Sequence, residues 1–358
     1  MTTEPVTLSD AFADHLRSVA ARADHVAGLG DRDKEVGDAL GLARELGRVL
    51  PLPGEGDTVA LWSALATVAA ADLTVARVVE PHLDALAILD QAAPGPEMLV
   101  PGDATWGVYA AEGGDAPLQA TGSAASGWRL TGTKPWCSLA DRVSHALVTA
   151  WVDDERRGLF AVDLADPGIR PDGSGTTWVS RGLAPVRSLG LQFDEAPAAA
   201  VGPPDWYLDR PGFAWGGVGV AAIWYGGAVG LARRLHRAAR GRTPDQVALV
   251  HLGRVDTALT AARVTLTAVA TSADSRACAP ADAGRAALRA RQVVADAAEV
   301  VLSSVGRALG PAPLTLEEDH ARRVADLTVY LRQHHAERDL ARLGESVLSD
   351  SGDVGCWW

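Results

Sequence analysis

Apolar residues recur at helical spacing through the first hundred positions. Thr7 and Asp10 form a capping-box-like start. The periodic apolar positions that follow it are Phe12, Leu16, Val19, Ala20, Ala23 and Val26. A second helix is predicted over 31–50 and ends at Pro51. The Ala- and Leu-rich segment 58–74 is expected to be buried, and Pro81 is expected to open a further helix. Short helices with apolar stripes need a common partner, so the pattern predicts a packed helical layer over residues 1–100.

The pattern changes near Pro101. From there to about Asp205, glycine and proline separate short runs of β-type residues. The runs cover 105–109, 128–131, 146–152, 158–162, 176–179 and 184–193. Closely spaced short strands predict a small antiparallel barrel or sandwich over residues 101–205. No helix of useful length fits between the strands, which argues against a doubly wound parallel sheet.

From Trp206 onward the pattern is helical again and the predicted helices are long. They cover 212–239, 244–271, 283–309 and 316–348, the last as one helix or a pair. Four long helices with short joints are typical of a bundle, here over residues 206–358. The fold class predicted is therefore mostly α with a central β domain. An N-terminal helical layer precedes that domain, and a C-terminal four-helix bundle follows it.

One stretch of the β region carries candidate chemistry. Residues 127–131 alternate like a half-buried strand, and Gly132 and Pro135 are expected to turn the chain before Trp136 and Ser138. An indole can stack on an aromatic ligand, and a hydroxyl beside it can hydrogen-bond the ligand's edge. The alternative is a tryptophan that packs under a β-turn and serves only the fold.

Composition narrows the function classes. The chain has 358 residues, 47% hydrophobic and 22% charged, and a formal net charge of −12. This charge argues against nucleic acid as the main partner, because phosphates would be repelled. The start shows no signal-peptide pattern, and no apolar run of about twenty residues predicts a membrane span. Three widely spaced cysteines, Cys137, Cys278 and Cys356, favour a reduced, cytoplasmic protein.

Residues 127–140, Gly-Trp-Arg-Leu-Thr-Gly-Thr-Lys-Pro-Trp-Cys-Ser-Leu-Ala, carry a family resemblance. Together with the domain order, they resemble the acyl-CoA dehydrogenase family, of which this chain would be a divergent member. The resemblance implies FAD as cofactor. It implies that Trp136 flanks the isoalloxazine ring and that Ser138 hydrogen-bonds its edge, with Cys137 between them in the cofactor-binding segment.

The loop after the first predicted strand departs from the family pattern. Tyr109 and Ala111 belong to the segment that the resemblance places at the flavin. Ala111 stands where a threonine hydroxyl would reach the flavin pyrimidine, so only backbone N–H groups remain to serve there. For the acidic Glu112 and Asp115 nearby, solvated turn residues are the alternative.

A basic segment in the bundle is the other cofactor candidate. Arg240 and Arg242 stand where the family has an arginine that reaches the cofactor pyrophosphate, often across a subunit boundary. A guanidinium suits phosphate oxygens because of its fork of donors. An exposed basic helix end is the alternative.

The implied reaction is alpha–beta dehydrogenation of an acyl thioester, with hydride transfer to the flavin. A glutamate normally takes the alpha proton, because burial can raise a carboxyl pKa toward the working pH. It is absent from 212–239, and at the second family position, eight residues after Asp326, stands His334. His334 and Glu337 are therefore the candidate catalytic residues. A solvent-facing helix end is the alternative for His334 and His335.

Other readings of the sequence stay open. A histidine in this region also suggests the flavin-dependent monooxygenases of the same fold, and a catalytically diverged member or a non-enzymatic binding protein are further alternatives. No metal site is predicted, because adjacent histidines on a helix diverge by about 100°. The resemblance implies an acyl thioester or related small molecule as substrate and an electron-transferring flavoprotein as electron acceptor. It also implies a homodimer or homotetramer formed through the bundle.

Overall fold

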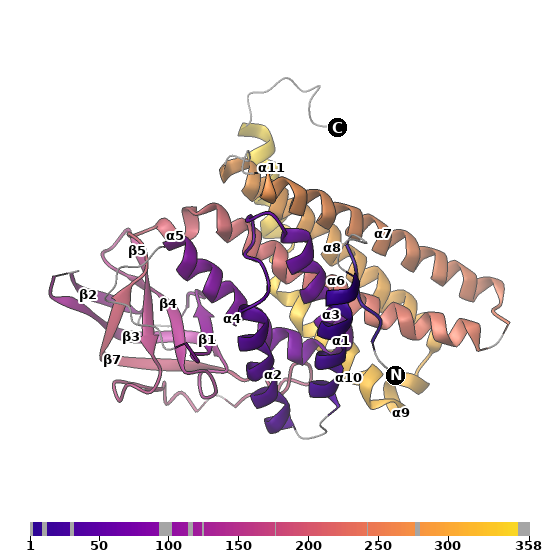
Figure 1. Ribbon diagram of the computed structural model, residues 1–358, viewed down its shortest axis with the longest axis horizontal. Coiled ribbons are helices and arrows are strands. Elements are labelled where there is room, and N and C mark those ends of the chain that lie inside the picture. Colours follow the sequence, from indigo (N-terminus) through magenta and orange to yellow (C-terminus); the bar gives the residue numbers. More distant parts are fainter. Residues whose placement is uncertain are drawn as a thin grey trace.

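The computed structural model describes residues 3–8, 13–28, 32–92, 102–113, 117–123, 125–175, 177–241, 243–275 and 280–349. The β domain lies at one end of the molecule, the N-terminal helices lie in the middle, and the long C-terminal helices extend to the other end (Figure 1). The N-terminal helices are α1 (Ala13–Ala27), α2 (Arg32–Gly47), α3 (Thr58–Ala71) and α4 (Leu73–Ala92). The predicted fold class, mostly α with a central β domain and a C-terminal bundle, is confirmed.

The junction of α3 and α4 differs from the prediction. The chain leaves the helical conformation at Asp72, with φ −155° and ψ 131°, and Asp72 Oδ1 accepts a hydrogen bond of 3.0 Å from the Val75 backbone N–H. Pro81 lies inside α4 and does not open a helix. A proline there removes the hydrogen bond to the carbonyl of Arg77. Because α4 is apolar and mostly buried, packing on both sides of Pro81 keeps the helix continuous.

The β domain is a small, nearly closed barrel. Its sheet follows the order β1-β4-β2-β3-β7-β5, and β5 also pairs with β4, which closes the ring. Most pairs are antiparallel as predicted, but β4 pairs in parallel with both β1 and β2. Residues 176–179 form no strand among the residues described there. The strands are β1 (Trp106–Tyr109), β2 (Gln119–Ser123), β3 (Gly127–Ser138), β4 (His145–Trp151), β5 (Arg157–Asp163), β6 (Ile169–Pro171) and β7 (Ser188–Ala200).

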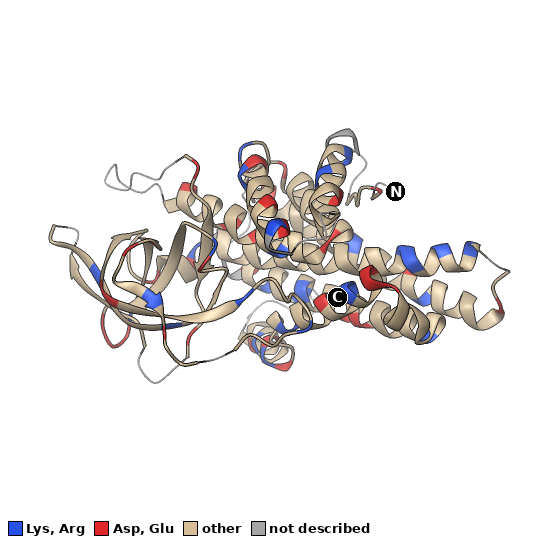
Figure 2. Ribbon diagram, turned by 90° about the horizontal axis from the view of Figure 1, so that it is seen from below, with Lys and Arg blue, Asp and Glu red and all other residues tan. Residues whose placement is uncertain are grey.

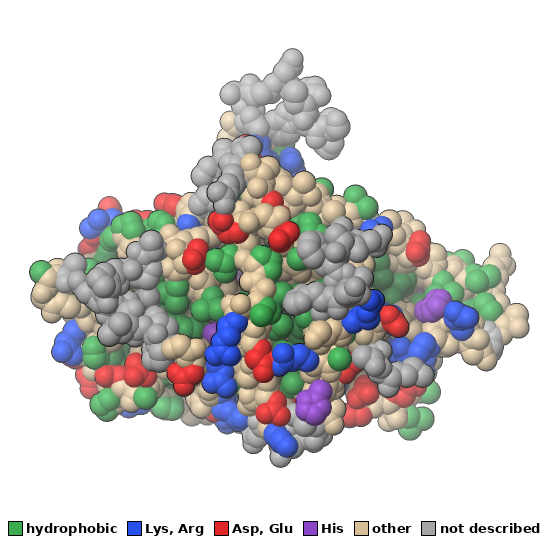
Figure 3. Space-filling view, in the orientation of Figure 1, with side chains coloured by type: hydrophobic (Ala, Val, Ile, Leu, Met, Phe, Trp, Pro, Cys, Tyr) green, Lys and Arg blue, Asp and Glu red, His purple; other side chains and the backbone are tan. Residues whose placement is uncertain are grey.

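The C-terminal region contains the predicted bundle. Its last long segment is a helix pair, because the short 3₁₀ helix η2 and His334 divide α10 from α11. The elements are α5 (Trp206–Asp209), α6 (Pro211–Arg240), α7 (Gln246–Asp274), α8 (Pro280–Leu309), α9 (Ala312–Leu316), α10 (Glu318–Tyr330), η2 (Leu331–Gln333) and α11 (Glu337–Ser349). Lys, Arg, Asp and Glu are interspersed along these helices (Figure 2) and on the face shown in Figure 3.

Helix α6 is the central helix of the molecule. It is the one helix among the described residues that is long and apolar enough to cross a membrane, and 67% of its most apolar window is buried inside the protein. It packs on α3 at a close crossing, where a Cβ added to Gly226 would lie 2.1 Å from the carbonyl oxygen of Ala66. The apolar composition of α6 is therefore explained by its place in the core.

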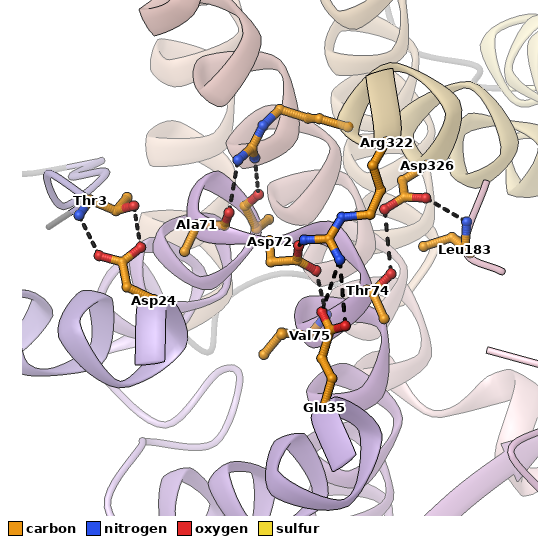
Figure 4. A network of polar contacts seen from close by, with 12 residues as sticks. Thr3, Asp24, Glu35, Ala71, Asp72, Thr74, Val75, Leu183, Arg322 and Asp326 are labelled. Atoms are coloured by element: carbon orange, nitrogen blue, oxygen red, sulfur yellow. Dashed lines mark hydrogen bonds and ion pairs between the residues drawn. The ribbon is translucent and has the colours of Figure 1, made fainter. Parts of the chain in front are cut away.

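Two adjacent arginines of α10 bind groups at the α3–α4 junction (Figure 4). Arg322 forms ion pairs with Asp72 and with Glu35 of α2, the latter at 3.2 Å. Arg323 donates hydrogen bonds of 3.1 and 2.8 Å to carbonyl oxygens at the end of α3, those of Ala69 and Ala71. These carbonyls lack helical partners, so the guanidinium satisfies them.

Asp326, one turn further along α10, joins the same network (Figure 4). It accepts a hydrogen bond of 2.6 Å from the backbone N–H of Leu183 and one of 3.4 Å from Thr74 Oγ1. Burial raises the pKa of Asp326 to about 6. The network therefore ties the loop before β7 and the start of α4 to the same face of α10.

The α3–α6 crossing gives a stability prediction. Gly226→Ala places a methyl group against backbone atoms, so we expect it to lower the free energy of unfolding by roughly 1–3 kcal/mol or more. Gly253→Ala on α7 is the control, because its Cβ would meet nothing within 4 Å. It should raise the free energy of unfolding by up to about 1 kcal/mol through helix propensity. Urea unfolding measures both, and equal effects of the two substitutions would contradict the close crossing.

Candidate functional site

The backbone at Trp136 is the first distinctive feature of the candidate site. The sequence predicts a turn here, but β3 continues through Gly132 and Pro135 to Ser138. Irregular pairing with β7 absorbs the change of direction between Lys134 and Cys137, as a β-bulge does. Trp136 has φ +59°, and 64% of the residue is exposed. The indole therefore stands away from the sheet and does not pack under a turn, while Cys137 points into the barrel core.

Ser138 is held by side chains from three other elements. Its Oγ lies 2.7 Å from Ser188 Oγ of β7 and accepts a hydrogen bond of 3.1 Å from Arg77 Nη2 of α4. The hydroxyl of Tyr109 in β1 donates a 3.0 Å hydrogen bond to the Ser138 carbonyl. The structure thus brings together Tyr109 and Ser138, two of the predicted cofactor-binding residues, and adds Arg77 and Ser188.

A buried lysine of β3, Lys134, has two polar partners close to this site. Lys134 is 1% exposed, and its Nζ donates to Glu112 Oε1 at 3.0 Å and to Thr149 Oγ1 at 2.8 Å. Glu112 Oε1 also lies 3.3 Å from Arg157 Nη1, as a second ion pair. Glu112 is therefore an ion-pair partner and not merely a solvated turn residue. Its neighbour Ala111 is exposed, and Asp115 lies outside the described residues.

An apolar pocket lies between α2, α3, α4 and α6. It holds about 500 Å³ of empty space, part of which is open to solvent. Its walls include the indoles of Trp62 and Trp215, and its acidic lining residues are Glu80 and Asp84 of α4. An apolar pocket with a few convergent polar groups is the usual form of a small-molecule site.

The carboxyl group of Glu80 connects this pocket to Ser138. Its Oε2 lies 3.5 Å from Arg77 Nη1 and accepts a 3.4 Å hydrogen bond from the Tyr330 hydroxyl. The guanidinium of Arg77 therefore bridges Ser138 and Glu80 directly. A second, smaller cleft lies at this junction and is lined by Arg77, Tyr109 and Ser138.

Both carboxyl groups of the pocket have shifted pKa values. Burial raises the pKa of Glu80 to about 7, and it also raises the pKa of Asp84. Asp84 lies one helical turn beyond Glu80, and the guanidinium of Arg210 is 3.9 Å from its Oδ1. Perturbed carboxyl groups in a cleft are a feature of functional sites.

His334, the predicted base, lies between the bundle helices and not among the residues lining the pocket. Its Nε2 is 2.9 Å from Gln292 Oε1 of α8, its Nδ1 is 3.4 Å from Asp339 Oδ2, and its ring meets Trp224 edge-on. Burial lowers the pKa of His334, the charge of Arg291 lowers it further, and Asp339 opposes both. Its catalytic role stays a prediction. Glu337 is exposed at the start of α11.

Of the two predicted phosphate-binding arginines, Arg240 is the one that the structure describes, and it lies away from the apolar pocket. Arg240 is exposed at the C-terminal end of α6, about 36 Å along the helix axis from Gly216 at the pocket. One copy of the chain therefore does not bring Arg240 to the apolar pocket. Arg242 lies outside the described residues. Within the described ranges, no group of three His, Cys, Asp or Glu residues could hold a metal ion.

The polar face of α4 was not predicted from the sequence. Arg77, Glu80 and Asp84 recur at helical spacing in a helix that is otherwise mostly apolar. This spacing places them on one face. Charged residues on one face of a buried helix were the available signal, but they are also typical of an ordinary solvent-facing stripe. Arg291 of α8 and Tyr330 of α10, which approach the same face, carried no sequence signal.

Comparisons with known proteins bear on the fold. No family model matches the sequence, and no curated protein matches it. Among solved structures, a nitrososynthase from Micromonospora carbonacea var. africana has a TM-score of 0.77 at 21% identity, over 98% of this chain and 100% of that one. TdsC from Paenibacillus sp. A11-2, a dibenzothiophene monooxygenase solved with FMN and indole, has a TM-score of 0.74 at 17% identity, over 92% and 97%.

A steroid ACAD variant, Tcur3481-Tcur3483, also matches, with a TM-score of 0.72 at 20% identity over 94% of this chain and 99% of that one. The chain therefore has the acyl-CoA dehydrogenase fold, as the segment 127–140 predicted. At identities this low, the structural matches establish the fold but not the reaction, which depends on the residues of the site.

The pair formed by His334 and Asp339 gives a titration prediction. In NMR pH titrations, His334 should titrate below the ordinary histidine pKa, because burial and the charge of Arg291 disfavour its charged form. Asp339→Asn should lower the His334 pKa further, since it removes the carboxylate that stabilises the imidazolium. A His334 pKa that rises in the variant would contradict the described pairing.

Proposed function

We propose that the protein is a flavin-dependent oxidoreductase that acts on a small, mostly apolar substrate. The observation that carries this proposal is the bridge formed by Arg77. It joins Ser138, at the predicted edge of the flavin, to Glu80 on the wall of the apolar pocket. A flavin at Ser138 and a substrate in the pocket would then be neighbours, as hydrogen transfer between them requires.

The residues of the β domain suit a flavin. The exposed indole of Trp136 offers a flat face for stacking, and the hydroxyl of Ser138 offers a hydrogen bond to the ring edge. Cys137 is buried, and Ala111 has no hydroxyl, so both would contribute backbone groups only. When bound, the flavin would accept two electrons from the substrate. The sequence resemblance implies FAD, whereas TdsC was solved with FMN.

Dehydrogenation of an acyl thioester at its alpha–beta bond is the reaction that we favour. The leucine-rich walls of the pocket, including Leu61, Leu65 and Leu83, suit an acyl or aryl-acyl chain. An electron-transferring flavoprotein would be the electron acceptor. The second candidate is oxygenation of a small substrate by reduced flavin. The buried His334–Asp339 pair and the likeness to TdsC favour this second reaction.

A homodimer or homotetramer remains part of the proposal. Helix α7 exposes large apolar side chains that no described part of the chain covers. They are Val247, Leu249, Val250 and Val264. A second copy of the chain that covers this face of the bundle would also place its own Arg240 near the flavin phosphates of the first copy.

A flavin titration tests the proposed function. The purified protein, mixed with FMN or FAD, should bind one of them and turn yellow, and anaerobic addition of an acyl thioester should bleach the bound flavin. A different outcome is product that forms solely when a flavin reductase and oxygen are both supplied. If that product contains an added oxygen atom, the second candidate reaction, oxygenation, is correct. A protein that binds neither flavin contradicts the proposal as a whole.

Ser138 gives a sharper test of where the flavin binds. Ser138→Ala should weaken flavin binding by about two- to tenfold, since one hydrogen bond is worth roughly 0.5–1.5 kcal/mol. Ser126→Ala is the control, because Ser126 is an exposed residue beside the β2–β3 turn whose hydroxyl contacts only its neighbours. Absorbance titration measures both affinities. Equal affinities of the two variants would place the flavin away from Ser138.

A further inference from the structure

We infer that Glu80 of α4 is the residue that takes the proton from the substrate. It would do the work of the glutamate that the bundle lacks at both expected positions. This inference rests on the proposed function, and it adds a catalytic residue from a different domain of the chain.

The orientation of the Glu80 carboxyl group supports this role. Oε2 is held by Arg77 and by the hydroxyl of Tyr330. Oε1 has no hydrogen bond to any described residue, and 15% of the side chain remains exposed at the pocket wall. One oxygen therefore fixes the carboxyl group, while the other remains able to accept a proton from a molecule in the pocket.

The other acidic group of the pocket is less suitable. Asp84 lies one helical turn beyond Glu80, on the side away from Arg77, and Arg210 approaches its carboxylate. Of the two acids, Glu80 is the one that contacts the guanidinium that also binds Ser138. A substrate atom that meets Glu80 would therefore lie on the side of the pocket nearest the predicted flavin.

The groups that face Glu80 hold the pKa of its carboxyl group near neutral pH. Burial is the largest influence and raises the pKa, and Asp84 raises it further. Arg77, Tyr330 of α10 and Arg291 of α8 act in the opposite direction. The resulting pKa is about 7. A base with such a pKa is ionised to a useful extent at neutral pH and still strong enough to accept a proton.

The hydrogen transfer balances with Glu80 in this role. Glu80 Oε1 forms an O–H bond with the alpha proton of the thioester, and the alpha C–H electron pair becomes the second bond of the new C=C. The beta hydrogen would leave with its electron pair as hydride, which an oxidised flavin bound at Ser138 would accept. The substrate thus loses two hydrogens and two electrons, and the proton on Glu80 returns to solvent after product release.

Glu80→Gln tests the inference in the flavin-loaded protein. The variant should bind flavin like the wild type, but its flavin should be reduced by hexanoyl-CoA about 10²- to 10⁴-fold more slowly. In the wild type the rate of reduction should rise with pH through about 7, because only the carboxylate accepts the proton. This rise should be absent in the variant. Asp90→Asn, an exposed acid on the same helix, is the control and should change neither property.

Glu80→Asp keeps the test decisive if Glu80→Gln fails to fold. It retains a carboxyl group at an altered distance, so reduction should slow but keep its rise with pH. A Glu80→Gln variant that folds, binds flavin and is reduced within threefold of the wild-type rate overturns the inference and leaves the proposed function intact. A wild-type protein that binds no flavin overturns the proposed function itself.

A second measurement needs neither flavin nor substrate. Carbon-13 NMR of the side-chain carboxyl groups in the free protein should show one glutamate that titrates near pH 7, and this signal should be missing in Glu80→Gln. A Glu80 carboxyl group that titrates below pH 5 would overturn the inference. The signal of Asp84 should remain in the variant, although its titration should shift because a neighbouring acid is lost.

Discussion

Two neighbouring guanidinium groups on α10 fix the geometry on which the site depends. Arg322 binds carboxylates of α2 and of the α3–α4 junction, and Arg323 binds the last carbonyls of α3. Removal of one partner from such a buried pair leaves an uncompensated charge, at a cost of about 3–5 kcal/mol. The direction in which α4 leaves the junction is set here, and with it the positions of Arg77 and Glu80.

Helix α4 takes part in both halves of the candidate site. It packs against β1 of the barrel and against α6 and α10 of the bundle. Arg77 contacts Ser138 of the barrel, and Glu80 faces the pocket between the helices. A displacement of this one helix would therefore change the proposed cofactor side and the proposed substrate side together. Pro81, directly after Glu80, has no N–H to donate, which leaves the carbonyl of Arg77 without its helical partner.

The order of the three regions followed from the sequence because proline and glycine mark where the hydrophobic period changes. The path of β3 did not, because a bulge lets a strand continue through Gly132 and Pro135, where the same residues usually make a turn. In the site, the resemblance singled out Trp136 and Ser138. Glu80 was missed because spacing shows which residues share a helix face, while only the tertiary packing shows what that face meets.

The left-handed backbone at Trp136 has a consequence for engineering this protein. A non-glycine residue in that conformation costs roughly 1–2 kcal/mol, and the exposed indole recovers little of this cost by burial. Glycine at this position would relieve the strain and would be expected to make the free protein more thermostable. Selection for thermal tolerance alone would therefore tend to remove the flat aromatic surface that a flavin ring would use. If the proposed flavin site is correct, stability and cofactor affinity would compete at this single residue.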